Sequence, residues 1–508
     1  MDGGTRGGTH EGRPGPVSEG ASAAALVARE RRRAEAANAR AERESERARQ
    51  ATQRALAAEA RLAALQASAT WRLTWPVRRL AHAVPRPLYE LVRGTPGRLL
   101  RSGGGGVTGP EPPPSAPGPA RPGSGRRPAA LLIDDHWPRP DRDAGSIEIV
   151  NWAEALLALG FEVLFAADRD HAAAGGSPGR DALAARGVRC LGPADAPSVQ
   201  AFLEREGGHL ALVVLNRVYC GGRFMEEVRH HCTGARVVFN TIDLHHIRLR
   251  READLHGDAS TLAVAAAVRE REEALARDAD ATVVVSEAER DVLAASVPGA
   301  NLVVLPLARE VHSPRAPFEA RSGIGFIGGF AHAPNLDAVR FFLAEVWPLV
   351  LRGDPGCAFD IVGADLPPGV LDGAPGTVRY LGPVADVGPW FESLRLTVAP
   401  LRYGAGVKGK VVSSLAAGVP CVATPAAVEG MDLRDGDGVS IASTPEALAE
   451  RVLCVHADAG LWAELSAGGI AHVAARFSPA AWHKTLAEAL WVIGALPDAA
   501  APREAGTG

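Results

Sequence analysis

The chain has 508 residues, of which 46% are apolar, and a formal net charge of −4. This length allows two or three domains, and the apolar fraction excludes a chain that is disordered throughout. Its six cysteines are scattered without a CxxC pair, which indicates reduced thiols rather than a disulfide framework. Without an apolar run of about 18 residues or a signal-peptide core, we expect a cytoplasmic protein, or one held peripherally at the inner face of the cell membrane.

Positive charge is concentrated before the globular part. Arginine outnumbers lysine 52 to 3, and residues 21–101 contain 17 Arg against 7 Glu. Ala, Glu and Arg dominate residues 21–70, which predicts a long helix. Its few leucines leave two alternatives, a weak coiled coil or a solvated single helix.

Aromatic, aliphatic and basic residues alternate after this predicted helix. Trp71 and Trp75 stand among arginines in the sequence WRLTWPVRRL. Tryptophan prefers the membrane interface and arginine pairs with lipid phosphate, so residues 71–101 are predicted to contact an anionic membrane surface. The alternative is that both tryptophans pack against the globular part.

Low-complexity segments flank the globular part. Residues 102–128 are rich in Gly, Pro and Ser, a composition that cannot build a core, and are predicted to be a linker. Residues 1–20 and the tail 495–508 are predicted to be disordered for the same reason.

Short β-rich runs alternate with amphipathic helices from Ala129 onward. Near-continuous apolar strands between helices predict a parallel sheet covered on both faces, in a first domain over 129–308. A helix is expected over Ser146–Leu159, with Ser146 as its cap. The expected strands are Ala129–Asp134, Glu162–Ala166, Leu210–Leu215, Arg236–Asn240, Thr282–Val285 and Leu302–Leu305.

The same pattern restarts in a second domain over 309–494. Together the two halves predict an α/β fold of two Rossmann-like, doubly wound parallel sheets facing a cleft, with ligands at the carboxyl ends of the strands. The expected strands are Ile324–Gly329, Ala358–Val362, Leu396–Pro400 and Pro420–Thr424. The expected helices are Asn335–Leu351, Lys410–Ala417, Pro445–Val455, Leu461–Arg476 and Pro479–Ile493.

A glycine-rich turn, PLRYGAGVKGK (400–410), joins a strand to a helix in this second domain. Glycines let the backbone approach a ligand, and free N–H groups at a helix start attract an anion. Two of the three lysines in the chain, Lys408 and Lys410, stand here, which favours a diphosphate held by compact ammonium groups. The alternative is a tight turn with incidental charge.

Polar residues also follow two strands of the first domain. Asp243, His245, His246 and Arg248 come after the strand Arg236–Asn240. The histidines either contact a ligand or lie on a surface helix. The loop after the first strand contains Asp143, Gly145 and Ser146. These residues are expected either to contact a phosphate or the acceptor, or only to form a turn and a helix cap. Ser286 is expected to cap a helix. His230, His231 and Cys232 fit no standard zinc spacing, so no metal site is predicted.

Several segments resemble family 4, or group 1, glycosyltransferases, which have the GT-B fold. The donor-binding half of that family is similar to GFIGGFAHAPNLDAVRFF (325–342), PLRYGAGVKGKVVSSLAAGVPCVAT (400–424) and VEGMDLRDG (428–436). The amino half is similar to residues 131–163, 239–253 and 283–293, and residues 69–80 resemble the segment that precedes transferase domains in bacterial O-antigen and capsule enzymes. The resemblance spans residues 69–494.

The resemblance implies transfer of a sugar from a nucleotide-sugar to a glycan or lipid-linked acceptor, with retention of configuration, in surface polysaccharide synthesis. No metal, other cofactor or nucleic acid is expected. It implies that the donor diphosphate meets Lys408, Lys410, Gly404, Gly406, Gly328, Gly329 and His332, the last of which is otherwise a loop histidine. It assigns catalytic roles to Asp243 and His245, nucleotide or sugar contacts to Arg402, Val407, Ser413 and Glu429, and acceptor-side contacts to Asp143, Gly145, Ser146, His246 and Arg248.

Two departures from the family bear on activity. Ser413 stands where many members have a glutamate that binds the ribose hydroxyls, and serine offers no charged bidentate acceptor. Gly329 and the stretch His332–Asn335 stand where many members have an arginine and a lysine. A catalytically inactive GT-B scaffold, with residues 21–101 as its working part, is therefore the alternative function. Nucleotide-sugar epimerisation ranks last.

Overall fold

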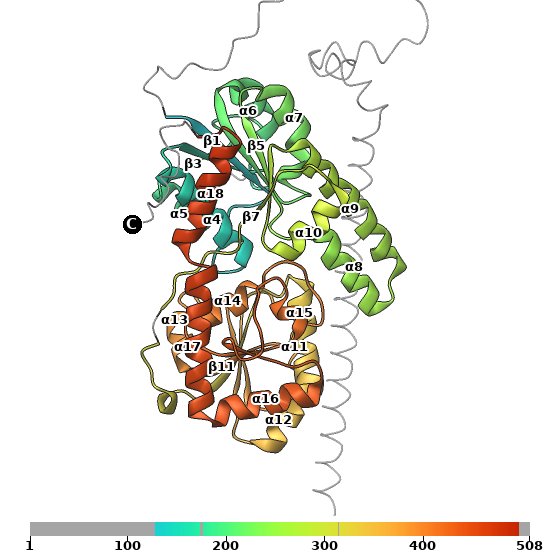
Figure 1. Cartoon of the computed structure of the whole chain (residues 1–508), viewed down its shortest axis with the longest axis vertical. Coiled ribbons are helices and arrows are strands. Elements are labelled where there is room, and N and C mark those ends of the chain that lie inside the picture. Colours follow the sequence, from blue (N-terminus) through green and yellow to red (C-terminus); the bar gives the residue numbers. More distant parts are fainter. Residues whose placement is uncertain (1–126, 173–175, 313, 497–508) are drawn as a thin grey trace, which may run out of the picture.

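Two domains stacked along the long axis make up the described part of the chain (Figure 1). The computed structural model describes residues 127–172, 176–312 and 314–496. The predicted long helix, the basic aromatic segment and almost all of the linker fall in residues 1–126, outside the described residues, as does nearly all of the predicted tail. Each domain is a parallel sheet between helices, so the two predicted doubly wound sheets are confirmed.

The first sheet has seven parallel strands in the order β3-β2-β1-β4-β5-β6-β7. Leu131 of β1 pairs with Leu164 of β2 and Val213 of β4, so apolar residues lie side by side. The strands are β1 (Ala129–Asp134), β2 (Glu162–Ala167), β3 (Arg189–Cys190), β4 (Leu210–Asn216), β5 (Arg236–Asn240), β6 (Ala281–Val284) and β7 (Leu302–Val304).

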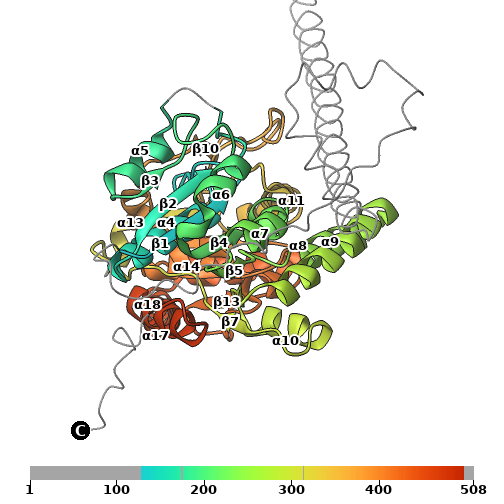
Figure 2. The ribbon, with the colours of Figure 1, turned by 90° about the horizontal axis from the view of Figure 1, so that it is seen from above.

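Helices cover both faces of this sheet (Figure 2). Leu131 and Ile133 of β1 belong to one buried cluster and Ala130 and Leu132 to another, because successive side chains of a strand point to opposite faces. The helices are α4 (Ala144–Ala158), α5 (Pro178–Ala185), α6 (Val199–Glu206), α7 (Met225–His231), α8 (His245–His256), α9 (Ala259–Asp278) and α10 (Glu287–Ser296).

The second sheet has six parallel strands in the order β10-β9-β8-β11-β12-β13. The strands are β8 (Gly323–Ile327), β9 (Phe359–Val362), β10 (Val378–Gly382), β11 (Leu394–Ala399), β12 (Cys421–Ala423) and β13 (Val439–Ile441). The helices are α11 (Ala333–Phe341), α12 (Trp347–Gly353), α13 (Gly388–Ser393), α14 (Gly409–Ala416), α15 (Pro425–Val428), α16 (Pro445–Ala457), α17 (Ala459–Arg476) and α18 (Pro479–Val492).

Two features of the second half differ from the sequence prediction. The helix expected over Asn335–Leu351 is divided by a π-helical turn, Phe342–Val346, because Pro348 has no N–H for the helical ladder. Helix α18, expected in the second domain, packs its side chains into the core of the first. There Trp482 meets Trp152 edge to face, with ring centroids 5.9 Å apart.

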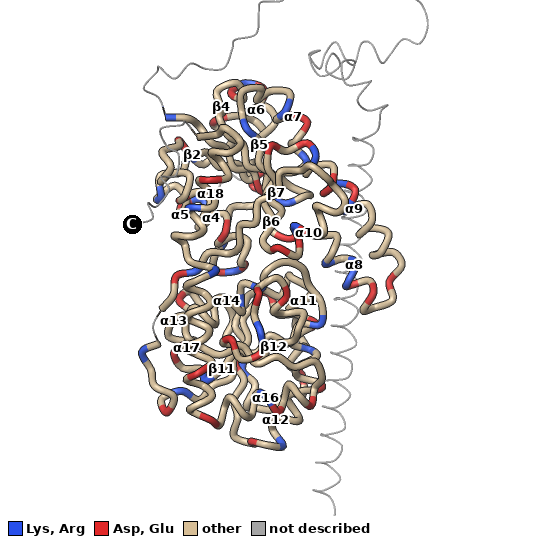
Figure 3. Tube along the Cα trace, in the orientation of Figure 1, with Lys and Arg blue, Asp and Glu red and all other residues tan. Residues whose placement is uncertain are grey.

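Charged residues of both signs are distributed over both domains (Figure 3). Among the described residues, none of the helices has the length and apolarity that a membrane span requires. All six cysteines are free thiols, as their spacing predicts.

Candidate functional site

The loops at the carboxyl ends of the two sheets meet in a closed seam between the domains. A Cβ at Gly406 of the second domain would lie 3.1 Å from the Cβ of Asp243 in the first. A Cβ at Gly430 would lie 2.8 Å from the Cβ of Ser286. Because these glycines have no Cβ, their backbone lies directly against side chains of the first domain. The polar residues predicted from the sequence converge along this seam.

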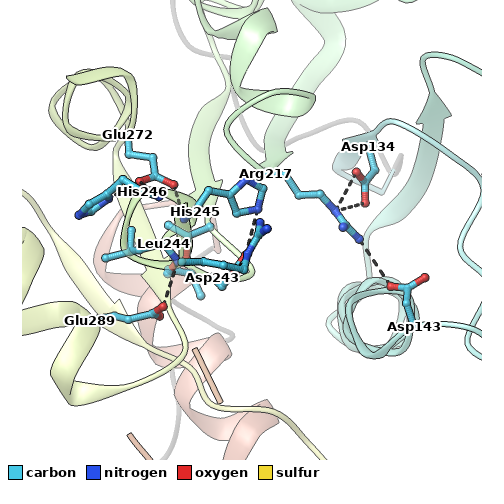
Figure 4. Close-up of polar contacts among 12 residues, drawn as sticks. Asp134, Asp143, Arg217, Asp243, Leu244, His245, His246, Glu272 and Glu289 are labelled. Atoms are coloured by element: carbon cyan, nitrogen blue, oxygen red, sulfur yellow. Dashed lines mark hydrogen bonds and ion pairs between the residues drawn. The ribbon is translucent and has the colours of Figure 1, made fainter. Parts of the chain in front are cut away.

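Asp243 and His245 form the centre of the first domain's side of the seam (Figure 4). They follow β5, and His245 is the first residue of α8. One carboxylate oxygen of Asp243 lies 2.9 Å from Nε2 of His245, and the other accepts a hydrogen bond of 3.1 Å from Nε of Arg248. Burial works to raise the pKa of Asp243, but His245 and Arg248 hold it well below its usual value, so this carboxylate stays charged.

Two buried glutamates hold this cluster in place. Glu289 accepts a hydrogen bond of 2.9 Å from the backbone N–H of Leu244. Glu272 accepts one of 2.8 Å from the N–H of His245 and lies 2.5 Å from Nδ1 of His246. The imidazole of His246 is therefore occupied by Glu272, whereas Nδ1 of His245 is buried without a hydrogen-bond partner. Sequence reasoning missed both glutamates.

A local signal existed for only one of these glutamates. Glu289 follows the cap Ser286 by three residues, the spacing of a capping box, and Ser286 accepts from the Glu289 N–H as the prediction of a cap requires. Burial, the largest effect, raises the pKa of Glu289 to about 7. Glu272 lies in the middle of α9, where no periodicity separates a buried acid from a solvated one.

Arg217 is a further functional candidate that the sequence prediction did not include. It follows β4, and its Nε lies 3.3 Å from the carboxylate of Asp134 at the end of β1. Its Nη2 lies 3.8 Å from Asp143, and a Cβ on Gly145 would lie 2.8 Å from the same atom. A signal was available, because a charged residue directly after an apolar strand is a typical site residue in such sheets.

The start of α4 differs from the prediction. Asp143, not Ser146, is the N-cap, because the Asp143 carboxylate accepts from the N–H of Ser146 at 2.8 Å and from its hydroxyl at 2.7 Å. An aspartate is as good a cap as a serine and here stands one turn earlier. Both residues lie at the carboxyl edge of the first sheet, as predicted.

Lys408 and Lys410 lie on the second domain's side of the seam. The Lys408 ammonium is buried and donates to the carbonyl of Gly406 at 2.5 Å, while the Lys410 ammonium donates to the Asn335 side chain. A Cβ on Gly328 would lie 3.0 Å from the Lys410 ammonium, so Lys410 faces the glycine bend after β8. Burial lowers the pKa of Lys408 to about 8 and that of Lys410 to about 7.

His332 joins the two sides. It is the N-cap residue of α11, and it is exposed at the surface of the seam. The charges of Asp243 and Arg248 in the first domain and of Lys410 in the second act on its imidazole. A Cβ on the neighbouring Gly329 would lie 2.8 Å from the carbonyl oxygen of Arg142, which again marks close packing of the two domains.

Ser413, which replaces the family glutamate, takes part in an interdomain network. Its hydroxyl accepts from Nε of Arg309 at 3.3 Å, and Nη1 of Arg309 donates to Glu148 of α4 at 2.6 Å. Burial raises the pKa of Glu148, and Arg309 opposes that rise. The carboxylate in this network is therefore that of Glu148, which comes from the first domain. No local sequence pattern predicts this contact.

The remaining candidates have partners within the protein. Glu429 binds Arg251 of α8 through two hydrogen bonds of 2.5 and 2.7 Å, which ties the domains together. Arg402 pairs with Asp337 in the middle of α11, and Val407 is half-buried against the core of the second domain. Their contacts with a donor stay predictions.

A pocket lies at the seam beside the Arg251–Glu429 pair. It has a volume of about 40 Å³ and is lined by residues that include Glu289, Ala405 and Gly406. This volume holds only a few water-sized spheres. A ligand as large as a nucleotide therefore enters this part of the seam only if the domains separate.

Several solved structures share this two-domain arrangement at low sequence identity. Sucrose-phosphate synthase from Thermosynechococcus elongatus aligns with a TM-score of 0.57 and 17% identity over 73% of this chain and 100% of that one. The Anabaena protein HepE, in complex with UDP and glucose, gives a TM-score of 0.54 and 14% identity over 72% and 100%. A glycosyltransferase from Rickettsia africae gives 0.52 and 11% over 72% and 98%. These likenesses show that the chain has the GT-B fold.

A family match decides the assignment of the second domain. The sequence model described as "Glycosyl transferases group 1" matches residues 321–458. Residues 321–458 are a group 1 glycosyl transferase domain. No curated protein matches the sequence of this chain. The group 1 domain contains Lys408, Lys410 and Ser413, whereas Asp243 and His245 face it from the first domain.

The contact of Gly406 with the first domain carries a prediction. Its φ of +63° lies in the left-handed region, and an alanine Cβ would stand 3.1 Å from Asp243 and 3.2 Å from Val285. We expect Gly406→Ala to destabilise the fold by about 1–2 kcal/mol and also to open the seam, which small-angle scattering would detect as a larger radius of gyration.

Gly436→Ala is the matched control for this prediction. Gly436 has a φ of +99°, but no atom lies within 4 Å of its Cβ position. The control variant should lose stability without opening the seam. Equal radii of gyration for the two variants would contradict the role of Gly406 in closing the group 1 domain on the first.

Proposed function

We propose that the chain is a retaining glycosyltransferase that moves a sugar from a nucleotide-sugar to a glycan or lipid-linked acceptor. One observation carries the proposal. Two lysines and a glycine bend at the carboxyl edge of the second sheet lie across the seam from the hydrogen-bonded pair Asp243 and His245. The group 1 match and the GT-B fold agree with this chemistry.

The lysine side of the seam suits the leaving group. When the bond between the anomeric carbon and the phosphate oxygen breaks, the nucleoside diphosphate gains negative charge that the protein must stabilise. Lys410 supplies a cation beside Gly328, in the bend between β8 and α11. No metal is needed for that stabilisation in this proposal.

The other side of the seam suits the sugar and the acceptor. Asp243 is a permanent carboxylate, so it is a strong acceptor for a sugar hydroxyl and a poor base. The Nε2 atom of His245 lies against Asp243, which leaves the buried Nδ1 as the ring atom without a partner. We assign Nδ1 of His245 to a hydroxyl of the donor sugar or of the acceptor.

Donor binding is the direct test. Calorimetry of the full chain against UDP-, GDP-, ADP- and TDP-sugars should show one of them binding, and mass analysis of the products should then show a transferred sugar. Binding without transfer would favour the inactive scaffold that Ser413 raises as an alternative. No binding to any member of the panel would overturn the proposal.

We further propose that the protein works on surface polysaccharides at a membrane, which rests on the sequence of residues 71–101. The full chain should sediment with anionic liposomes, because Trp71, Trp75 and the arginines around them suit an anionic interface. Replacing both tryptophans with serine should release most of the bound protein. Equal sedimentation of the two proteins would contradict this prediction.

A further inference from the structure

Three side chains of different chemistry converge at the edge of the second domain that lies away from the seam. The carboxylate of Asp354, the thiol of Cys357 and the imidazole of His456 each bring one atom within 4.8 Å of the others. Asp354 and Cys357 stand in the turn between α12 and β9, and His456 is near the end of α16. This turn precedes a strand, so the cluster lies at the amino edge of the sheet.

The distances between the three ligand atoms describe a small triangle. The Sγ atom of Cys357 lies 3.2 Å from Oδ2 of Asp354 and 4.0 Å from Nδ1 of His456, and the latter two atoms are 3.7 Å apart. Zinc binds thiolate at about 2.3 Å and imidazole nitrogen or carboxylate oxygen at about 2.0–2.2 Å, so tetrahedral ligand atoms stand about 3.3–3.6 Å from one another. Small side-chain shifts bring the triangle to that geometry.

The imidazole is already oriented as a ligand. Its Nε2 lies 2.9 Å from the carbonyl oxygen of Ser322, and a carbonyl can only accept, so Nε2 carries the proton. The lone pair of a neutral ring therefore stands on Nδ1 and points at the thiol. A backbone carbonyl that holds the far nitrogen of a histidine is the usual support of a metal ligand.

Two acceptors inside the triangle face a single donor. The Cys357 thiol has one proton, and Oδ2 of Asp354 and Nδ1 of His456 compete for it. Arg395 is the nearby cation, but its Nη1 donates to the backbone carbonyl of His456. A metal ion in place of the thiol proton would engage all three atoms at once.

We propose that Asp354, Cys357 and His456 form a zinc-binding site. On binding, the thiol releases its proton to solvent, the thiolate, Nδ1 and Oδ2 coordinate the ion, and water takes the fourth position. Cys357 and His456 are buried, whereas the Asp354 side chain is 44% exposed and leaves the ion a path from solvent. The site would fasten α16 to the turn before β9, remote from the proposed chemistry (Figure 1).

Metal analysis of the untagged full-length chain tests this site. After treatment with a chelator, reloading with zinc and dialysis, the protein should retain about one zinc per chain. Cobalt in place of zinc should give a thiolate charge-transfer absorption band. Cys357→Ser should abolish both signals, and Asp354→Asn should weaken zinc binding while its side chain still accepts from the N–H of Gly356, as Asp354 does at 3.0 Å.

Cys454→Ser is the matched control, because Cys454 is an exposed thiol on the same helix, two residues before His456. It should keep the zinc and the cobalt band. Circular dichroism would show whether each variant is folded. Zinc retention no greater in the wild type than in Cys357→Ser would overturn the proposal, and so would an equal loss in Cys454→Ser.

Discussion

Replacing Lys410 with methionine is expected to lower donor turnover by about 10²–10³-fold, the usual loss when one group that stabilises transition-state charge is removed. The Lys410 ammonium stands beside the Gly328 bend and lies over the ring of Phe326, 4.3 Å from its centroid. Burial lowers its pKa to about 7, so burial disfavours the charged form. Methionine keeps the length of the side chain and removes that desolvation cost, but it also removes the donor to the Asn335 side chain, so the two effects oppose each other and the melting temperature should change little.

The same substitution should change the pH dependence. Lys410 is protonated below about pH 7 and neutral above it, so kcat/KM for the donor should fall as pH rises through that value. In Lys410→Met this limb disappears, and the remaining decline follows Lys408, whose pKa burial lowers to about 8. Initial rates between pH 6 and 9, a range of about one unit beyond each pKa, would separate the two limbs.

Lys484→Met is the control, because Lys484 is the third lysine of the chain and lies exposed on α18. It should behave as the wild type in rate and in pH profile. If Lys410→Met turned over the donor as fast as Lys484→Met does, the assignment of the diphosphate to this bend would be wrong.

Asp243→Asn is expected to reduce turnover by about 10²–10⁴-fold, because the variant has the same shape but lacks the charge that orients its partners. The carboxylate holds Nε2 of His245 at 2.9 Å and Nε of Arg248 at 3.1 Å. An amide accepts with only one oxygen, so one of these two contacts is lost. His245→Gln should give a similar loss if Nδ1 of His245 contacts the sugar or the acceptor.

Stability must be measured with these rates, because Asp243 also contributes to folding. Its folded pKa is depressed, so its contribution is present above the unfolded value and is lost as pH falls. Asp243→Asn should therefore lower the melting temperature at neutral pH. Asp254→Asn is the control, since Asp254 is an exposed acid on α8, the helix that follows Asp243, and lies 3.8 Å from Arg250. A turnover loss in Asp243→Asn no larger than its unfolded fraction would remove Asp243 from the site.

The fold was predicted best where a secondary-structure element depends on neighbouring residues of the sequence. The apolar runs of the inner strands placed β1, β4 and β5 to within a residue, because a strand buried on both faces needs an unbroken apolar stretch. The strands that the prediction missed, β3, β10 and β13, all lie at sheet edges. An edge strand pairs on one side only and is short or exposed, so its composition carries little signal.

The site was predictable to the same degree. Asp243 and His245 were indicated by their place shortly after a strand and by the family resemblance, and Lys408 and Lys410 by the glycine-rich turn and the rarity of lysine in this chain. Their supports could not be found in this way. Glu272 binds residues 26 and 27 positions earlier, and Arg309 meets Glu148 across 161 positions. Residues so far apart in the chain form no short sequence motif, so their contacts cannot be predicted from the spacing of residues.

The amino-acid sequence by itself determined the two parallel sheets, the glycine and lysine turn and the acidic and histidine cluster, because periodicity, propensity and turn chemistry act over neighbouring residues. Only the tertiary structure decided that α18 returns to the first core, that Glu289 and Glu272 hold the Asp243–His245 loop, and that Ser413 shares an arginine with the other domain. These contacts depend on how two folded domains meet, and burial at that seam, rather than the order of residues along the chain, sets the charges of the groups that face it.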